Sequence, residues 1–207
     1  MTTAPRVVVI DYGAGNLGSV KRAFEECGAV AVITGHPEEL RQATHLVLPG
    51  VGAFNAGMSN LRRSGLDAAI KELVLQKRVQ FLGICLGMQL LAAKGWEGGE
   101  TDGLDLIGGE VKLLEAGTGE RLPHMGWNEV EYEKSAPLFF NIPSGTDFYF
   151  VHSYHFVCRN KSESVATTPY GGGFTSAVQK ENICGTQFHP EKSQKPGLQL
   201  IKNFLKS

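Results

Sequence analysis

Cys85 has the sequence surroundings of a catalytic nucleophile. It lies at the centre of residues 83–87 (G-I-C-L-G), between the apolar run 79–82 and the helix-like segment 88–93. A nucleophile on a sharp strand-to-helix turn needs small residues two positions before and after it, and both are glycine here. Such a turn exposes the sulfur at a helix N-terminus, which favours the reactive thiolate. The spacing predicts nucleophilic catalysis.

A cysteine nucleophile requires a base, and residues 185–191 can provide one. His189 and Glu191 are two residues apart at the end of an expected strand, so their side chains point to the same side. Glu191 can then accept one imidazole N–H and leave the other nitrogen of His189 for Cys85. A His-Pro-Glu sequence alone is more often structural, but beside the glycine-flanked cysteine it favours a Cys-His-Glu triad.

A glycine-rich turn, P-G-V-G at residues 49–52, follows another expected strand. Ligands of open parallel sheets bind beyond the carboxyl ends of the strands, where this turn and Cys85 are both expected. The backbone N–H groups of the turn and of Leu86 are natural oxyanion donors, and losing one typically costs about 3–4 kcal/mol. Without Cys85 nearby, an ordinary βα turn explains this segment equally well.

A competing motif lies near the N-terminus. Residues 13–18 match G-x-G-x-x-G, follow an expected strand and open an expected helix, as a dinucleotide-binding loop does. That loop also requires an acidic residue at the end of the next strand, but Glu38 and Glu39 follow Pro37 inside an expected helix. We therefore favour a glycine-rich turn, with a dinucleotide-dependent oxidoreductase as the alternative.

The elements that must position these residues differ between the two halves of the chain. The first half alternates expected strands, at 6–11, 29–34, 45–48 and 79–84, with expected helices, at 17–27, 37–42 and 66–77. The second half contains mainly strands, expected at 111–115, 127–132, 148–157, 165–168, 174–179 and 183–188, before a closing helix at 195–206. We predict one α/β domain over residues 1–207, an open, mixed, mainly parallel sheet flanked by helices, with a more antiparallel second half.

Composition excludes several classes of function. The 207 residues include 20 Lys and Arg against 21 Asp and Glu, which gives no basic face for nucleic acid or an anionic membrane. There is no apolar run of the roughly 18–20 residues that a membrane span needs, and no signal-peptide pattern. The four cysteines and six histidines are scattered, without disulfide-like or zinc-like spacing. We expect a cytoplasmic protein without metal or cofactor.

The motifs together resemble those of the triad-type class I glutamine amidotransferases. Those shared with the whole class are G-I-C-L-G-M-Q at 83–89, P-G-V-G at 49–52 and F-H-P-E-K-S at 188–193. Three more resemble the glutaminase subunits of imidazole glycerol phosphate synthases, from histidine biosynthesis. They are D-Y-G-A-G-N-L-G-S at 11–19, H-M-G-W-N at 124–128 and Y-F-V-H-S-Y at 149–154.

This resemblance implies an activity and a set of roles. Cys85 attacks the carboxamide of L-glutamine, His189 protonates the leaving ammonia, and Glu191 orients the imidazole; water then releases glutamate from a thioester. The N–H groups of Val51 and Leu86 hold the oxyanion. The resemblance further implies glutamine-binding positions at Gly50, Gly52, Gln89, Glu97, His152, Ser153 and Tyr154.

The resemblance also implies a partner, a (β/α)8-barrel cyclase in a heterodimer, which uses the ammonia to make imidazole glycerol phosphate and an aminoimidazole carboxamide ribotide. The implied interface residues are Tyr12, Asn16, His124, Met125, Trp127 and Asn128. Three alternatives stay open: a glutaminase that serves another synthase, a hydrolase of γ-glutamyl peptides, and a non-catalytic binding subunit.

Overall fold

Five neighbouring strands form the parallel part of the sheet. The computed structural model describes residues 4–132 and 136–207, so residues 1–3 and 133–135 of the predicted domain lie outside the description. In spatial order the parallel strands are β2 (Val30–Thr34), β1 (Arg6–Ile10), β3 (His45–Gly50), β4 (Gln80–Cys85) and β13 (Ile183–Thr186). β1 is buried on both faces, which explains its uninterrupted run of valines and isoleucine. The predicted β-α alternation is confirmed.

The sheet continues with mostly antiparallel strands. Beyond β13 it adds β12 (Phe174–Lys180), β10 (Tyr154–Cys158), β7 (Gly109–Leu113), β5 (Lys94–Gly95) and β6 (Thr101–Asp102), and β11 (Ser164–Thr168) pairs with β12. Antiparallel pairing joins β13 to β12, β12 to β10, and β10 to β7. The prediction of an open mixed sheet whose second half is more antiparallel is therefore confirmed.

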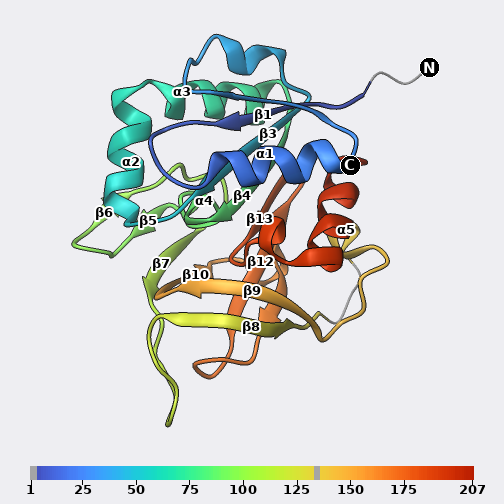
Figure 1. Ribbon diagram of the computed structural model, residues 1–207. Coiled ribbons are helices and arrows are strands. Elements are labelled where there is room, and N and C mark those ends of the chain that lie inside the picture. The colour runs from blue at the N-terminus through green and yellow to red at the C-terminus, as the bar shows by residue number, and fades with distance from the viewer. Residues whose placement is uncertain (1–3, 133–135) are drawn as a thin grey trace.

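β8 (His124–Val130) and β9 (Thr146–His152) form a separate two-stranded ribbon. Figure 1 shows this ribbon crossing β12 and β13, and its buried Phe148 and Phe150 belong to the same core cluster as that face of the sheet. The single strand predicted at 148–157 is wrong, because the chain leaves the ribbon at Ser153 and enters the main sheet as β10. The apolar alternation of Phe148, Phe150 and Phe156 keeps the same phase across this break, so the sequence pattern does not mark it.

Helices cover both faces of the sheet. α2 (Phe54–Arg63) and α3 (Leu66–Lys71) pack on one face, and α1 (Leu17–Glu26) and α5 (Gln194–Phe204) pack on the other with the ribbon. The helix predicted at 66–77 continues past Lys71 only as a π-helical turn, Glu72–Gln76. α2 was not predicted; Gly57 interrupts its apolar face at the point where Leu90 packs closely. No helix within the described residues is long and apolar enough to cross a membrane.

Single turns of 3-10 helix complete the described part of the chain. They are η1 (Glu39–Gln42), η3 (Pro137–Phe139), η4 (Lys161–Glu163) and η5 (Pro190–Lys192). The first of them lies where a short helix was predicted over residues 37–42. The last follows His189 directly and carries Glu191, so it sets the direction of that carboxylate relative to the histidine.

The turn at Cys85 is as sharp as its flanking glycines predict. Cys85 has φ 54° and ψ −109° between β4 and α4 (Leu86–Gln89). A Cβ on Gly83 would lie 2.5 Å from the carbonyl oxygen of Gly87, and one on Gly87 would lie 1.7 Å from that of Leu48. Only glycine fits either position.

The helix expected after this turn is much shorter than predicted. α4 ends at Gln89, whereas the sequence pattern indicated a helix over residues 88–93. The carbonyls of Leu90 and Leu91 instead accept hydrogen bonds from the N–H groups of Leu104 and Leu106. Because a distant segment satisfies these carbonyls, helical hydrogen bonds are not needed there.

Candidate active site beyond the parallel strands

A cavity of about 360 Å³ lies beyond the carboxyl ends of β3 and β4. Its lining includes these residues predicted from the sequence: Val51, Gly52, Cys85, Leu86, Gln89, Glu97, His152, Ser153 and Tyr154. Ala53, Pro123 and Val151 also line it and were not predicted. Gly50 is buried directly behind this wall, paired with Cys85 in the sheet. The expected edge of the sheet therefore carries the cavity.

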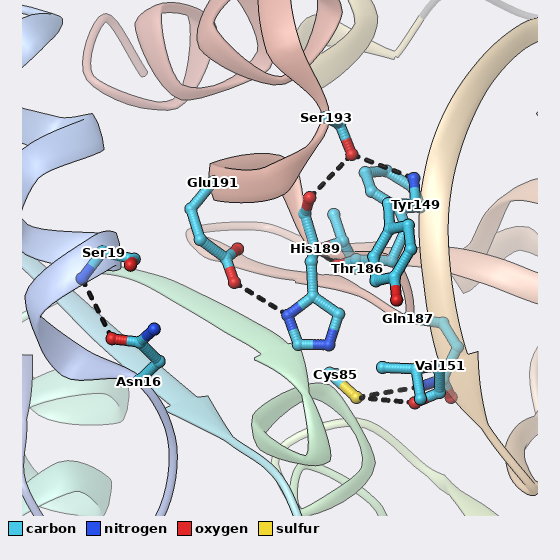
Figure 2. A network of polar contacts seen from close by, with 11 residues as sticks. Asn16, Ser19, Cys85, Tyr149, Val151, Thr186, Gln187, His189, Glu191 and Ser193 are labelled. Atoms are coloured by element: carbon cyan, nitrogen blue, oxygen red, sulfur yellow. Dashed lines mark hydrogen bonds and ion pairs between the residues drawn. The ribbon is translucent and has the colours of Figure 1, made fainter. Parts of the chain in front are cut away.

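The end of β13 brings His189 to Cys85. β13 pairs in parallel with β4, and Thr186 lies opposite Ile84. The segments that follow the two strands therefore leave the sheet side by side. Nδ1 of His189 lies 2.8 Å from Oε1 of Glu191, and their side chains are only 4% and 3% exposed. Figure 2 shows the far edge of the imidazole turned toward Cys85. Nε2 of His189 is buried and has no hydrogen-bond partner among the described residues, which leaves it available to the thiol.

Strand β9 holds the backbone of this histidine. The N–H of His189 donates to the carbonyl of Tyr149 at 2.9 Å. The buried hydroxyl of Ser193 donates to the carbonyl of His189 at 2.6 Å and accepts from the N–H of Tyr149 at 3.0 Å. These contacts fix the position of His189 relative to the ribbon. Sequence reasoning did not single out Ser193, although it is the last residue of the F-H-P-E-K-S motif.

Besides His189, two polar groups of the described residues lie near the sulfur of Cys85. It lies 3.8 Å from the carbonyl oxygen of Val151, to which a thiol can donate, and 3.7 Å from Nε2 of Gln187, which can donate to a thiolate. Gln187 is fully buried and was not predicted as a site residue. Its position two residues before His189 in an extended segment is the signal that was available. Both protonation states of the sulfur therefore have a partner.

Charge favours a protonated histidine beside this sulfur. Burial works against the charged imidazole, but the nearby sulfur of Cys85 and the hydrogen-bonded carboxylate of Glu191 outweigh it and raise the pKa of His189 to about 9. The negative charges of Glu191 and of an ionised Cys85 therefore favour the imidazolium form of His189. A cation at this position stabilises the thiolate of Cys85, the nucleophilic form of the side chain.

The glycine-rich N-terminal loop packs against the turn at 49–52. A Cβ on Gly15, whose φ is 99°, would lie 3.3 Å from Cα of Gly50. Asn16 accepts a hydrogen bond from the N–H of Ser19 and caps α1. The close approach and the positive φ give Gly15 a structural role without any dinucleotide.

Tyr12 lies on the same loop and points inward. It is 5% exposed, and its hydroxyl oxygen would lie 1.9 Å from a Cβ on Gly50. This hydroxyl has no hydrogen-bond partner among the described residues. Burial, and to a smaller extent negative charge at Cys85, raises the pKa of Tyr12. The phenol of Tyr12 therefore packs against Gly50, on the buried side of the predicted oxyanion turn.

The other predicted interface residues divide into two groups. Met125 and Trp127 on β8 are 63% and 49% exposed, Asn16 is exposed, and Asn128 is half-buried. His124, like Tyr12, is buried inside the chain. The side chains of His124 and Tyr12 contact the chain's own residues, and the place of all six residues at a partner interface stays a prediction.

Glu97 is one of the residues that line the cavity. Its Oε2 accepts a hydrogen bond of 2.8 Å from the N–H of Phe54, the first residue of α2. A carboxylate is favourable there because the helix N-terminus carries partial positive charge. The same contact holds the side chain beside the cavity that it lines.

Comparison with known proteins identifies the class. The family model "Glutamine amidotransferase class-I" matches residues 8–207. The chain is 50% identical over 198 residues to the imidazole glycerol phosphate synthase subunit HisH of Moorella thermoacetica, covering 96% of this chain and 93% of the relative. It is 48% identical over 200 residues to subunit HisH 1 of Campylobacter jejuni strain RM1221, covering 97% and 99%. The chain belongs to the class-I glutamine amidotransferases and, among them, to the family of these HisH subunits.

Solved structures of more distant proteins share the fold. One glutamine amidotransferase aligns over 97% of this chain and 99% of its own, with a TM-score of 0.75 at 19% identity. PurLQS of Thermotoga maritima aligns over 99% of each chain, with a TM-score of 0.75 at 18% identity. At such low identity these likenesses establish the architecture alone.

The charge of His189 gives a pH prediction. A raised pKa means that the stability from charged His189 is complete below about pH 6.5, the value for an unfolded histidine, and is lost as pH rises through about 9. In an NMR titration of the imidazole, we expect a midpoint near pH 9 in the native chain. Cys85→Ala and Glu191→Gln should each lower it. A midpoint near 6.5 in the native chain would contradict the assignment.

The unpartnered hydroxyl of Tyr12 gives a stability prediction. Burying a hydroxyl without a hydrogen bond costs about 1–3 kcal/mol, so Tyr12→Phe should raise the free energy of unfolding by about 1 kcal/mol. Urea denaturation measures this change. Tyr132→Phe is the matched control, because the hydroxyl of Tyr132 donates to the carbonyl of Ile142 and its loss should destabilise the chain. Equal destabilisation by both variants would show that Tyr12 has a partner in solution.

Proposed function

We propose that this chain hydrolyses L-glutamine to glutamate and ammonia, as the glutaminase subunit of imidazole glycerol phosphate synthase in histidine biosynthesis. The observation that carries the proposal is the buried imidazole of His189, held by Glu191 on one side and open to Cys85 on the other. The HisH relatives, named as subunits of that synthase, support the particular enzyme. We place the catalytic domain over residues 1–207 and its site of action in the cytoplasm.

The geometry supports the following steps. The thiolate of Cys85 attacks the side-chain carboxamide carbon of glutamine. The carboxamide oxygen becomes an oxyanion, which the N–H groups of Val51 and Leu86 hold. The imidazolium of His189 donates its proton to the leaving nitrogen, and ammonia departs from a γ-glutamyl thioester. Neutral His189 then takes a proton from water as the water attacks the thioester. Glutamate leaves, and the thiolate–imidazolium pair is restored.

The cavity wall offers groups that would recognise glutamine. Glu97 in the cavity wall would pair with the α-ammonium group of the substrate, since a carboxylate is the natural partner of a cation. The other residues that we assign to glutamine binding are Gly50, Gly52, Gln89, His152, Ser153 and Tyr154. The backbone of the turn at 49–52 lies between this cavity and the N-terminal loop, so a change in that loop can alter the oxyanion donors.

A surface on the ribbon suits a protein partner. Met125 and Trp127 are exposed on β8, and the ring of Trp127 lies 6.1 Å from that of Tyr149 on β9. Nζ of Lys192, just after the triad glutamate, lies 5.6 Å from the centroid of Tyr149. Exposed aromatic and methionine side chains are enriched at interfaces. We propose that this surface, with Asn16 and Asn128, binds the other component of the synthase, which is a (β/α)8-barrel cyclase that receives the ammonia.

The catalytic proposal predicts the effect of losing one sulfur atom. With the cyclase and its nucleotide substrate present, Cys85→Ala should lower glutamate release at least about 10³-fold, because no thioester can form. The matched control is Cys27→Ala, which removes a half-buried thiol at the end of α1 and should release glutamate at the native rate. A glutamine-like diazo-ketone should label Cys85 in a mass spectrum. Glutamate release that survives Cys85→Ala would remove the triad from the reaction.

The partner proposal predicts a separable effect. Trp127→Ala should weaken cyclase binding about tenfold or more, because exposed tryptophans at interface centres contribute strongly to affinity. Calorimetric titration of this chain with the cyclase measures it. Phe140→Ala is the control, since Phe140 is 59% exposed but lies outside the ribbon. If Phe140→Ala weakened binding and Trp127→Ala did not, the partner would bind another face.

A further inference from the structure

Two buried histidines face each other across the ribbon. His124 on β8 and His152 on β9 are directly opposed in the strand register and are 4% and 6% exposed. Nδ1 of His124 lies 3.1 Å from Nε2 of His152. The reaction steps described above use neither ring for proton transfer. A buried polar pair of this kind needs an explanation.

The carbonyl of Tyr154 determines which nitrogen of each ring carries the proton. A carbonyl only accepts, so Nδ1 of His152, at 2.9 Å from it, is the donor. In a neutral ring Nε2 of His152 then only accepts, and Nδ1 of His124 must be the donor to it. Nε2 of His124 accepts in turn from Nδ2 of Asn128 at 3.2 Å. A single assignment of the ring protons satisfies every contact: Asn128 donates to His124, His124 donates to His152, and His152 donates to the carbonyl of Tyr154.

Burial keeps both rings neutral, as this assignment requires. Burial lowers the pKa of His152 to about 3 despite its hydrogen bond to the Tyr154 carbonyl, and burial also lowers the pKa of His124. A second proton on His152 would place two donors against each other at the contact between the histidines. A second proton on His124 would place its Nε2 donor against the amide donor of Asn128. The neutral state and the direction of the hydrogen bonds therefore support each other.

The inner end of the series reaches the catalytic sulfur. The carbonyl of Tyr154 also accepts from Nε2 of Gln89 at 2.8 Å, and the same Nε2 donates to Oε1 of Gln187 at 3.0 Å. Nε2 of Gln187 lies 3.7 Å from the sulfur of Cys85. A continuous hydrogen-bond chain, Asn128–His124–His152–Tyr154–Gln89–Gln187–Cys85, thus runs from the ribbon to the nucleophile.

We infer that His124 is a positioning residue for the cleavage of glutamine. By donating to Nε2 of His152, it stabilises the tautomer whose Nδ1 donates to the carbonyl of Tyr154. That carbonyl accepts from Gln89, and Gln89 in turn holds Gln187 next to the sulfur. The catalytic part of this inference rests on the proposed glutaminase function. Because Asn128 follows the exposed Trp127 on β8, the outer end of the chain of hydrogen bonds lies beside the proposed partner surface.

The tautomers are tested on the native chain without glutamine. In long-range ¹H–¹⁵N spectra of histidine-labelled protein near pH 7, His124 and His152 should both carry a proton on Nδ1 and none on Nε2. In His124→Leu the resonances of His152 should change, because Nε2 loses its donor. A charged His152, or one protonated on Nε2, in the native chain would overturn the inference whether or not the chain hydrolyses glutamine.

Kinetics test the positioning role in the complex with the cyclase. His124→Leu should lower kcat/KM for glutamine about 10- to 100-fold, because small displacements of reacting groups cost that much. His124→Asn keeps an amide donor near the place of Nδ1 and should regain at least half of the loss on a logarithmic scale. His45→Leu, which replaces a buried histidine on β3 outside the hydrogen-bond chain, should stay within about twofold of native.

The outcomes separate the two proposals. Native kcat/KM in a folded His124→Leu variant would overturn the positioning role while leaving the glutaminase intact. An equal loss in His124→Asn and His124→Leu would also overturn it, since hydrogen-bond donation would then not matter. Absence of glutamate release from the native complex would instead contradict the proposed function, and the tautomer spectra would still decide the hydrogen-bond assignment.

Discussion

The site depends on one buried imidazole placed between a sulfur and a carboxylate. His189 and Glu191 are almost fully buried, so the imidazolium interacts with its neighbours through protein rather than through water. A charge in such surroundings is unfavourable unless both sides of the ring have partners. Glu191 and Cys85 supply these partners from the end of β13 and the end of β4. The parallel pairing of β4 and β13 is therefore the constraint that brings the triad together.

Two features near the triad destabilise the folded chain. The positive φ of Cys85 costs about 1–3 kcal/mol for a residue with a side chain, and the buried hydroxyl of Tyr12 lacks a partner among the described residues. Strands β1, β3 and β4, which are buried on both faces of the sheet, hold the strained turn at Cys85 in place. Such strain next to a nucleophile is consistent with a site arranged for chemistry, because Cys85 is thereby exposed to the cavity although it is only 5% exposed overall.

The sequence predicted the parts of the fold whose signals are local. Gly83 and Gly87 predicted the sharp turn because steric exclusion acts within a few residues, and the spacing of His189 and Glu191 predicted a shared direction for the same reason. The break at Ser153 could not be predicted, since apolar alternation continues through it while the chain changes sheets. The early end of α4 could not be predicted either, because the carbonyls of Leu90 and Leu91 just after it accept hydrogen bonds from residues more than ten positions away.

The same distinction explains what the sequence did not reveal about the site. Tyr12 and His124 lie in motifs that resemble interface segments, and the sequence did not show that both side chains are buried, because burial is a property of tertiary packing. Gln187 was not predicted because its role depends on the contact between its amide and the sulfur of Cys85, which only the folded structure shows.

The β8–β9 ribbon has three roles that a single sheet could not combine. β9 supplies the carbonyl of Val151 to the sulfur and that of Tyr149 to the backbone of His189. β8 presents Met125 and Trp127 on the outside, directly opposite Val151 and Tyr149. Since the residues that touch the catalytic groups pair with the exposed ones, a partner bound to β8 would lie one strand away from the nucleophile. The ribbon's separation from the main sheet is what allows this arrangement, because its strands can then cross β12 and β13 beside the cavity.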